Sequence, residues 1–321
     1  MKSLFRRSKS LAIGLVMVIS LAGGYYLARN LRWEALIQLG APLIAALLAL
    51  SLGYLGVYAI SVWGLLYGLG YNVHFGLLWL AVTSSMSSNY LTPVKAGIPV
   101  RLWLYKALLN VPVTAGGASV VVESALGMLL GVGLAIVGAP RLLPDRNVQD
   151  IAVILGFGVL GALIVLLSPQ LSETLVRWVV PKRYIAKILH WESQFCNSLR
   201  SVPVKILVWV IILYSVRLAI RALCIYLVLY ASGGFTNWLD LLFAQAISGM
   251  VGIISMLPTG LGARDASMTL LLMNLGIPQD IALVGVLVDR VLWTLTPFGI
   301  GLLSINILSF KGLVHKETLG L

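Results

Sequence analysis

The sequence predicts an all-α polytopic membrane protein, with about six full spans and two broken or re-entrant helical hairpins. The first observation is composition: 60% of the 321 residues are hydrophobic and 11% are charged, whereas soluble domains carry about 25% charged residues. The second is that several apolar runs exceed the roughly 18 residues typical of a membrane span. The third is that two apolar segments are shorter, and each follows a break rich in proline, glycine and charge.

The hydrophobic elements begin close to the N-terminus. The basic segment MKSLFRRSKS precedes an apolar run that ends at Arg29 and Arg32. A cleaved signal peptide begins in the same way, but a run of about 18 residues is long enough to be retained as a span. The predicted elements are 11–28, 42–69, 75–92, 97–109, 112–138, 150–168, 205–231, 238–257, 262–275 and 279–309.

The stretch 170–204 differs from the rest of the chain because it mixes charged residues with leucine, valine, tryptophan and isoleucine. This mixture predicts one or two amphipathic helices lying on the cytoplasmic membrane surface. An ordinary solvated cytoplasmic loop would explain the mixed composition of this stretch equally well. No stretch has the composition of a soluble domain, so we expect a single membrane domain over residues 1–321.

Two parts of the chain share a pattern that predicts an internal duplication. In each, a proline stands four residues before a glycine, a second proline follows, and an acidic residue stands 11 residues after that second proline. The matched positions are Pro93, Gly97, Pro112 and Glu123 in the first copy, and Pro258, Gly262, Pro278 and Asp289 in the second. The pattern predicts repeats over about 75–138 and about 238–309.

The predicted topology inverts the second copy. Three probable spans separate the copies, and an odd number brings the second copy in from the opposite face, as in many transporters. With the N-terminus inside, the inner segments hold 13 lysine and arginine residues and the outer segments hold four. This bias places both termini in the cytoplasm.

Nine charged residues fall within or beside the predicted intramembrane elements. They are Lys95, Arg101, Arg217, Arg221, Arg264 and Arg290, with Glu123, Asp265 and Asp289. A charge at the bilayer centre costs about 2.5–3.5 kcal/mol on insertion scales, so these groups are expected to face one another or a water-filled cavity. Their positive surplus predicts an anion site, and phosphate matches the paired donors of guanidinium groups.

Pairing within this set leaves alternatives open. Glu123 could pair with Arg101 or Lys95, and the neighbours Arg264-Asp265 and Asp289-Arg290 could pair across the second copy. Arg217 and Arg221 are four residues apart and therefore share a helix face. Each of these residues also has an explanation without a ligand, as a snorkelling side chain or as one partner of an interhelical ion pair.

The backbone breaks strengthen the prediction of an anion site. The breaks contain Pro93 and Gly97 in the first copy, and Pro258, Gly260 and Gly262 in the second. The helices that follow begin inside the membrane, so their free N–H groups and positive dipole ends face whatever occupies the break. Gly260 and Gly262 also let the backbone approach a ligand closely.

The motifs TPVKAGIPVRLWLYK and LPTGLGARDASM resemble the membrane region of the lysylphosphatidylglycerol synthetase/flippase family, over about residues 10 to 310. The matching positions are Pro93, Gly97 and Arg101 in the first motif, and Leu257, Pro258, Gly260, Gly262 and Arg264 in the second. Many relatives carry an acid where this chain has Ile98, and Asp265 replaces the usual glutamate. The resemblance implies lipid handling by flipping, in a stand-alone form without the soluble synthetase domain, and does not imply lysyl transfer.

The sequence thus predicts a transporter that moves an anionic phospholipid or a polyprenyl-phosphate-linked lipid between the leaflets of a prokaryotic inner membrane. The alternatives are an intramembrane transferase acting on a lipid phosphate and a non-transporting membrane partner of a separate synthase. His74, His190 and His315 are isolated, and no nucleotide-binding loop is present, so we expect no metal, no cofactor and no nucleic-acid partner.

Overall fold

A computed structural model describes residues 39–91, 97–143, 145–147, 149–150, 153–154, 156–158, 161, 201–255, 260 and 262–310. The predicted first span and most of the predicted interfacial segment 170–204 lie outside these ranges. So do Pro93, Lys95, Leu257 and Pro258 of the predicted breaks. The roles predicted for these residues therefore stay predictions.

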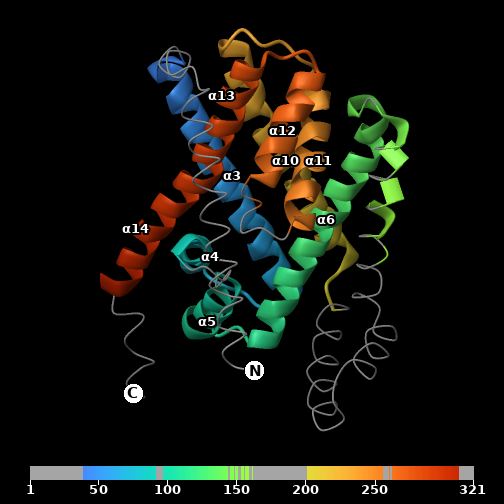
Figure 1. Ribbon diagram of the computed structural model, residues 1–321. Helices are drawn as coiled ribbons and strands as arrows, with labels where there is room; N and C mark the ends of the chain where they lie inside the picture. Colours follow the sequence, from blue (N-terminus) through green and yellow to red (C-terminus); the bar gives the residue numbers. More distant parts are fainter. Residues whose placement is uncertain are drawn as a thin grey trace, which may run out of the picture. The chain divides into compact units, whose positions relative to one another are not determined.

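The elements that the structure describes are all helical (Figure 1). They are α3 (Gly40–Gly68), α4 (Phe75–Leu91), α5 (Gly97–Leu109), α6 (Val113–Leu142), α10 (Val204–Ala231), α11 (Trp238–Ile254), α12 (Ala263–Asn274), α13 (Gln279–Arg290), the π-helical turn η2 (Val291–Leu295) and α14 (Thr296–Phe310). The all-α prediction is confirmed for these ranges. Most helix ends fall within one to four residues of the predicted ends.

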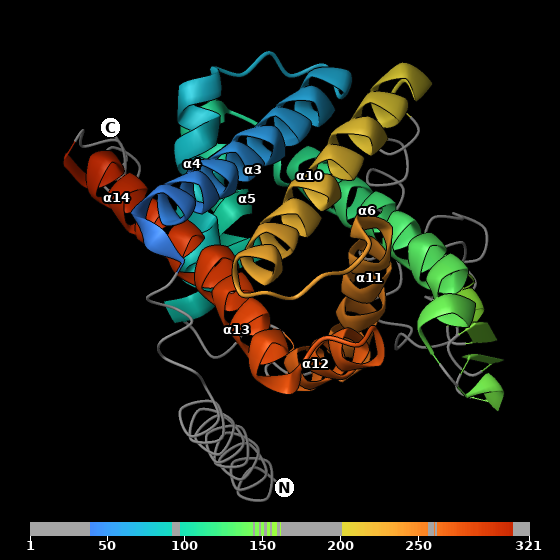
Figure 2. The same cartoon turned by 90° about the horizontal axis from the view of Figure 1, so that it is seen from above.

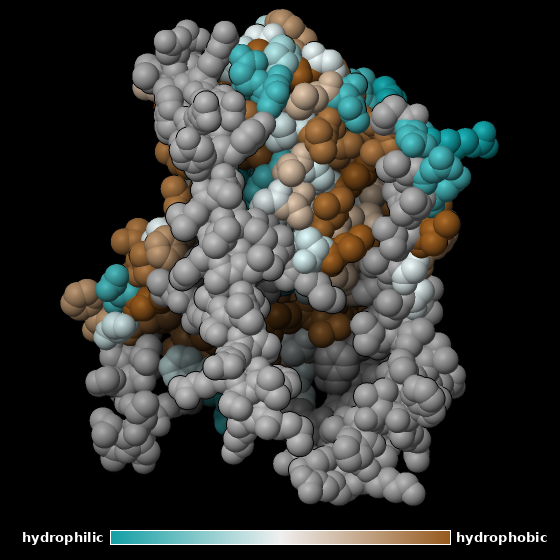
Figure 3. Space-filling model, in the orientation of Figure 1, coloured by the Kyte–Doolittle hydropathy of each residue, from teal (hydrophilic) through white to brown (hydrophobic). Residues whose placement is uncertain are grey.

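Among the described residues, four helical segments are long and apolar enough to cross a membrane: Gly40–Gly68, Val113–Leu142, Val204–Ala231 and Gln279–Phe310. The helices at Phe75–Ser88 and Trp238–Ile254 are also apolar but shorter. Large hydrophobic side chains on the long helices are exposed, including Val137, Ile212 and Leu303, and hydrophobic colouring covers much of the described surface in Figure 3. A surface of this kind is expected where a protein faces lipid, so the chain is a multi-pass membrane protein. The total number of spans and the inverted repeat stay predictions.

The element predicted over 279–309 is a helical segment with a change of winding at its middle. α13 runs directly into η2, and η2 runs directly into α14. A π-helical turn widens the helix and displaces its usual hydrogen bonds. Within this turn, the carbonyl of Leu292 accepts a hydrogen bond of 3.2 Å from the Ser51 hydroxyl.

The helices divide between two compact units, which we describe separately. Unit 1 comprises Met1–Ala46, Leu134–Ala152 and Ala222–Arg290, and unit 2 comprises Leu47–Gly133, Val153–Arg221 and Val291–Leu321. The hairpin of α4 and α5 belongs to unit 2, and the hairpin of α11 and α12 belongs to unit 1. Each unit therefore contains one of the two broken elements that the sequence predicted.

Unit 2 depends on close packing of α4 against both α5 and α14 (Figure 1). The Ser87 hydroxyl donates to the Phe298 carbonyl at 2.8 Å, and the hydroxyls of Thr83 and Ser304 lie 2.8 Å apart. A Cβ atom added to Gly301 would collide with the Ser87 hydroxyl and the Thr83 carbonyl. Small side chains thus let the two helices approach and exchange hydrogen bonds, as is common inside membranes.

Unit 1 packs α11 against α12, and α12 against α13 (Figure 2). Its core contains Ile247 from α11, Leu272 from α12 and Val286 from α13. Asn237 immediately precedes α11, and its side chain caps the helix by accepting a 3.0 Å hydrogen bond from the Leu239 amide. These contacts hold α11, α12 and α13 together as the core of unit 1.

Candidate functional site

Eight of the nine charged residues predicted to lie inside the membrane gather in two clusters, one in each unit, and the ninth, Lys95, lies outside the described residues. We name the set Arg101, Arg217, Arg221 and Glu123 in unit 2 the three-arginine cluster. We name the set Arg264, Asp265, Asp289 and Arg290 in unit 1 the paired cluster. The two clusters differ in net charge and in how their hydrogen-bonding groups are satisfied.

Three helices supply the three-arginine cluster. α5 carries Arg101, α6 carries Glu123, and α10 carries both Arg217 and Arg221. Arg101 lies one turn into a helix that begins immediately after the first break, as the motif predicted. The spacing of four residues places Arg217 and Arg221 on the same face of α10.

The Glu123 carboxylate lies between two guanidinium groups. Its Oε2 accepts a hydrogen bond from Arg101 Nη1 at 3.2 Å and another from the Tyr58 hydroxyl at 3.3 Å. Its Oε1 lies 3.8 Å from Arg217 Nη1, which is an ion-pair distance but too long for a hydrogen bond. Of the two partners that the sequence allowed for Glu123, the structure brings Arg101 into contact, and it adds Arg217.

Tyrosine rings surround Arg217. Its guanidinium carbon lies 4.3 Å from the ring centre of Tyr58, 4.8 Å from that of Tyr54 and 4.9 Å from that of Tyr214. Arg217 Nη2 also donates to the Tyr54 hydroxyl at 3.0 Å. Aromatic faces attract a cation without neutralising it. The rings therefore hold Arg217 in place while its positive charge remains.

Arg101 and Arg221 have aromatic neighbours of their own. Arg101 Nη2 donates to the Tyr58 hydroxyl at 2.5 Å, and its guanidinium carbon lies 5.2 Å from the same ring centre. Arg221 lies over Trp293, 5.5 Å from the ring centre. Trp293 belongs to η2 and contacts the Tyr54 ring at 4.4 Å between centroids. The π-helical turn thus supplies an aromatic surface to the cluster.

Positive charge exceeds negative charge in this cluster. Arg101 and Arg217 both face the single carboxylate of Glu123, so these three residues carry a net charge of +1. The side chains of Arg101 and Arg217 are only 6% and 10% exposed. Within the described ranges, Nε of Arg101 and Nε of Arg217 have no hydrogen-bond partner. Buried guanidinium N–H groups with surplus positive charge are suited to binding an anion.

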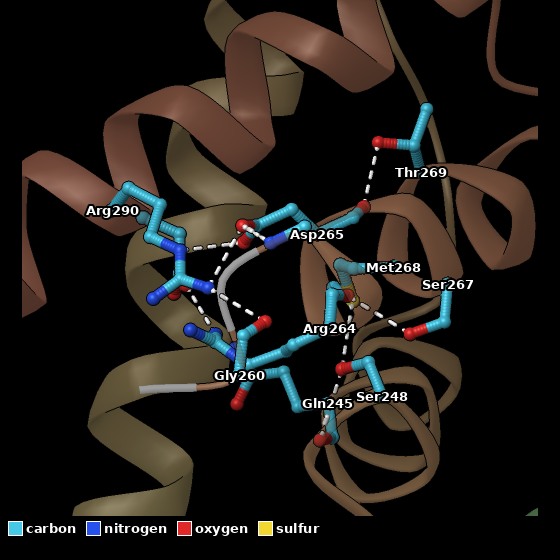
Figure 4. A network of polar contacts seen from close by, with 11 residues as sticks. Gln245, Ser248, Gly260, Arg264, Asp265, Ser267, Met268, Thr269 and Arg290 are labelled. Carbon is cyan, nitrogen blue, oxygen red and sulfur yellow. Dashed lines mark hydrogen bonds and ion pairs between the residues drawn. The ribbon is translucent and has the colours of Figure 1, made fainter. Parts of the chain in front are cut away.

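The paired cluster connects the start of α12 to the end of α13. Arg264 forms an ion pair with Asp289, and Arg290 forms one with Asp265. Arg290 Nε donates to Asp265 Oδ1 at 2.6 Å and its Nη2 donates to Oδ2 at 2.8 Å (Figure 4). This is the pairing across the second copy that the sequence suggested. With two arginines and two aspartates, the cluster has no net charge.

The same cluster fixes the second break. Arg290 Nη2 also donates to the Gly260 carbonyl at 3.3 Å, and the Gly262 amide donates to Asp265 Oδ2 at 3.3 Å (Figure 4). Gly260 and Gly262 have φ values of 66° and 80°, which favour glycine. A Cβ atom on Gly260 would also come within 3.0 Å of the Gly252 Cα atom. Asp265 and Arg290 therefore bond directly to the backbone of Gly260 and Gly262.

Sequence reasoning missed the aromatic part of the site. Tyr54, Tyr58, Tyr214 and Trp293 lie within apolar runs and were given no role in the sequence analysis. Spacing could have found Tyr214, since it precedes Arg217 by three residues and therefore lies on the same helix face. Sequence reasoning also missed the ion pair of Arg141 and Asp240 in unit 1, in which Arg141 Nε lies 2.7 Å from Asp240 Oδ1. The substrate-binding roles predicted for the charged residues stay predictions.

The described residues include no group of three or more histidine, cysteine, aspartate or glutamate side chains placed to hold a metal ion. The fold and the two clusters define a polytopic membrane protein with ionisable groups in its interior. Its features are membrane-length helices, short helix pairs at two breaks and charged clusters among apolar helices. Residues 9–301 match the family described as the lysylphosphatidylglycerol synthase TM region, and the chain belongs to this family.

A curated relative matches a smaller part of the chain. This relative is the protein named glycosyltransferase AglD, from Haloferax volcanii, which is 38% identical over 93 residues. The match covers 29% of this chain and 15% of the relative. The matched segment is therefore a minor part of both proteins.

Proposed function

We propose that the protein is a lipid transporter that moves a lipid with an anionic headgroup between membrane leaflets. The observation that carries this proposal is the pair of buried guanidinium groups of Arg101 and Arg217, which share the single carboxylate of Glu123 and keep buried N–H groups without a hydrogen bond, in a chain with membrane-length apolar helices. A buried surplus of charge is costly unless it serves a function. An anionic headgroup would balance it, while the acyl or prenyl tails stay in lipid.

The family supports this proposal because it is named for a phospholipid, lysylphosphatidylglycerol. The inferred substrates are an anionic phospholipid or a polyprenyl-phosphate-linked lipid. The inferred movement is rocking or gating of the two repeats, which alternates access to the cluster from each side. The inferred location is a prokaryotic inner membrane, with both termini in the cytoplasm.

A scrambling assay in proteoliposomes tests the proposal. Purified full-length protein is reconstituted with fluorescently labelled phosphatidylglycerol, and a membrane-impermeant quencher reports how fast the label crosses. We expect the double variant Arg101→Gln/Arg217→Gln to lower the rate at least about tenfold, equivalent to about 1.4 kcal/mol. Lys106→Gln is the control, because Lys106 is an exposed cation on the same helix as Arg101. Equal rates for wild type and the double variant would exclude the proposed site.

A second candidate follows from the relative in Haloferax volcanii. The chain matches a small part of a protein named as a glycosyltransferase. This favours a membrane module that works with a transferase, or an intramembrane transferase acting on a lipid phosphate. Co-purification of a synthase, with no scrambling by the protein alone, would support the module. Formation of a modified radiolabelled lipid by purified protein would support the transferase.

A further inference from the structure

We infer that the Tyr105 hydroxyl is a further headgroup contact of the three-arginine cluster, and that it donates a hydrogen bond to a phosphate oxygen of the bound lipid beside Arg101. The inference rests on the proposed function and adds a ligand-contacting residue to the same site. It follows from hydrogen-bonding groups that are buried together in unit 2, and it does not depend on the net charge of the cluster.

Tyr105 lies on α5, one turn after Arg101. The spacing of four residues places the two side chains on the same face of the helix, and the guanidinium carbon of Arg101 lies 5.8 Å from the centre of the Tyr105 ring. Tyr105 is fully buried. Its ring packs against α6, where a Cβ atom added to Gly116 would lie 3.1 Å from the ring carbon Cδ2. The ring is therefore confined to a position beside Arg101.

The Tyr105 hydroxyl differs from two other tyrosine hydroxyls of the cluster in its hydrogen bonds. The hydroxyls of Tyr54 and Tyr58 accept hydrogen bonds of 3.0 and 2.5 Å from arginines, and that of Tyr58 also donates to Glu123 at 3.3 Å. The Tyr105 hydroxyl is buried and has no hydrogen-bond partner among the described residues. Because buried tyrosine hydroxyls normally have a partner, this one indicates a contact that the described residues do not supply.

The other unused groups of the two buried arginines are donors. Nε of Arg101, and both Nε and Nη1 of Arg217, are buried without a hydrogen-bond partner among the described residues, and a guanidinium group has no acceptor. The phenol hydrogen of Tyr105 therefore needs what these N–H groups need, which is an acceptor oxygen. The oxygens of an ionised phosphate diester accept without donating and form strong hydrogen bonds with such donors, whereas an ammonium group would only add further donors.

The Glu123 carboxylate does not satisfy these donors. Its Oε2 already accepts from Arg101 and Tyr58, and its Oε1 lies 3.8 Å from Arg217, which is beyond hydrogen-bonding distance. A phosphate oxygen next to Arg101 Nε can accept from the Tyr105 hydroxyl as well, because the two donors belong to one face of α5. Since the hydroxyl is buried, a headgroup reaches it only when the packing around α5 opens, as the proposed alternating access requires.

The test measures stability and binding with full-length protein in nanodiscs made of a zwitterionic lipid. Phosphatidylglycerol is the probe, and the rise of the thermal midpoint with its mole fraction gives the apparent affinity. Tyr105→Phe should leave the midpoint without phosphatidylglycerol unchanged or raised, because no hydrogen bond to the described residues is lost. The same variant should weaken phosphatidylglycerol binding at least about fivefold, equivalent to about 1 kcal/mol.

Tyr54→Phe is the matched control, because it removes the same atom from the same cluster but breaks a hydrogen bond within the protein, the one from Arg217. It should lower the midpoint without phosphatidylglycerol. Tyr67→Phe, at a tyrosine that is 58% exposed, should change neither measurement.

Two results with Tyr105→Phe would overturn the inference. If the variant fails to fold, or lowers the midpoint as Tyr54→Phe does, the hydroxyl has a structural partner in the protein. If the folded variant binds phosphatidylglycerol as tightly as the wild-type protein, the hydroxyl does not contact the headgroup.

Inorganic phosphate is the other source of phosphate oxygens. Millimolar phosphate without phosphatidylglycerol should leave the midpoint unchanged; a rise equal to that with the lipid would assign the site to soluble phosphate and overturn the assignment to a headgroup. The result is separable from that of the scrambling assay. Scrambling that depends on Arg101 and Arg217, with binding indifferent to the Tyr105 hydroxyl, would refute only the inference. Binding that depends on this hydroxyl, without scrambling, would refute only the proposed function.

Discussion

Arg290 and Asp265 are 25 residues apart in sequence and form a bidentate ion pair, with N–O distances of 2.6 and 2.8 Å. The same arginine donates to the Gly260 carbonyl, and the same aspartate accepts from the Gly262 amide. This pair therefore joins the end of α13 to the loop that carries the second motif.

Replacing Arg290 with lysine tests the importance of this planar pairing. Lysine keeps the charge but cannot make two parallel hydrogen bonds and also reach the Gly260 carbonyl. We expect Arg290→Lys to lower stability by about 2 kcal/mol, the range for hydrogen bonds to charged groups. Thermal unfolding in detergent, followed by size-exclusion fluorescence, measures the change. Arg146→Gln, at an exposed position in the same unit, should leave the midpoint unchanged; an equal shift in both variants would contradict the prediction.

Arg264→Gln should destabilise the protein more strongly. Its partner Asp289 has a side chain only 3% exposed, so the variant leaves a buried carboxylate without its ion-pair partner. The expected loss is about 3–5 kcal/mol. The double variant Arg264→Gln/Asp289→Asn should recover part of this loss, because the charge is removed from both sides. Purely additive losses would show that the two residues are not coupled.

Gly260→Ala tests the backbone geometry of the second break. A positive φ costs an L-residue about 1–2 kcal/mol, and the added Cβ would also lie 3.2 Å from the Arg264 Cβ atom. We therefore expect a loss of at least about 1 kcal/mol. Gly249→Ala is the matched control, since Gly249 lies inside α11 with nothing within 4 Å of an added Cβ. The Gly249→Ala control should be neutral or stabilising. If the control is also destabilised, the loss in Gly260→Ala cannot be attributed to its positive φ and close contacts.

Gly301→Ala tests the contact of α4 with α14. The added methyl group would collide with the Ser87 hydroxyl and the Thr83 carbonyl, and overpacking of this kind costs about 1–3 kcal/mol. Gly299→Ala, two residues earlier in the same helix, meets nothing within 4 Å and should be tolerated. Thermal midpoints of the two variants give the comparison. Equal midpoints would mean that the methyl group added at position 301 does not lower the stability of the contact between α4 and α14.

Tyr58→Phe tests the aromatic part of the three-arginine cluster. The ring is kept, but the hydroxyl that bonds both Arg101 and Glu123 is lost. If the cluster binds the transported headgroup, scrambling should slow by about threefold or more, or about 0.7 kcal/mol, with little change in the amount of folded protein. Tyr67→Phe is the control, because Tyr67 is 58% exposed. Identical rates for both variants would exclude the Tyr58 hydroxyl from transport.

Much of the helical architecture could be predicted because apolar length and Pro/Gly breaks are local signals. The predicted element 97–109 coincides with α5, and 262–275 differs from α12 by one residue at each end. The π-helical turn at Val291–Leu295 could not be predicted, because it depends on contacts of Leu292 and Trp293 with α3 and α10.

The candidate site could be predicted as a set of charges but not as an arrangement. Composition identifies Arg101, Glu123 and Arg217 as costly to bury, yet it does not say that one carboxylate lies between two arginines. Nor does it say that Arg264 and Arg290 each have an aspartate partner while Arg101 and Arg217 share one glutamate. That difference depends on which helices pack together, and helix packing is set by interactions far apart in sequence.

The contact of α4 with α14 also has a consequence for biosynthesis. Ser87 and Phe298 are separated by 211 positions, so a ribosome adding about 5–20 residues per second needs about 10–40 s to supply the second after the first. During that interval α4 is already made and α14 does not yet exist. In that interval the Thr83 hydroxyl still has a hydrogen-bond partner, because it donates to the Trp79 carbonyl one turn earlier at 2.7 Å. It therefore avoids the free-energy penalty of an unpaired polar group in the membrane. The α4–α5 hairpin is therefore expected to acquire its final packing only near the end of translation, and chains released before α14 are expected to be targets for membrane quality control.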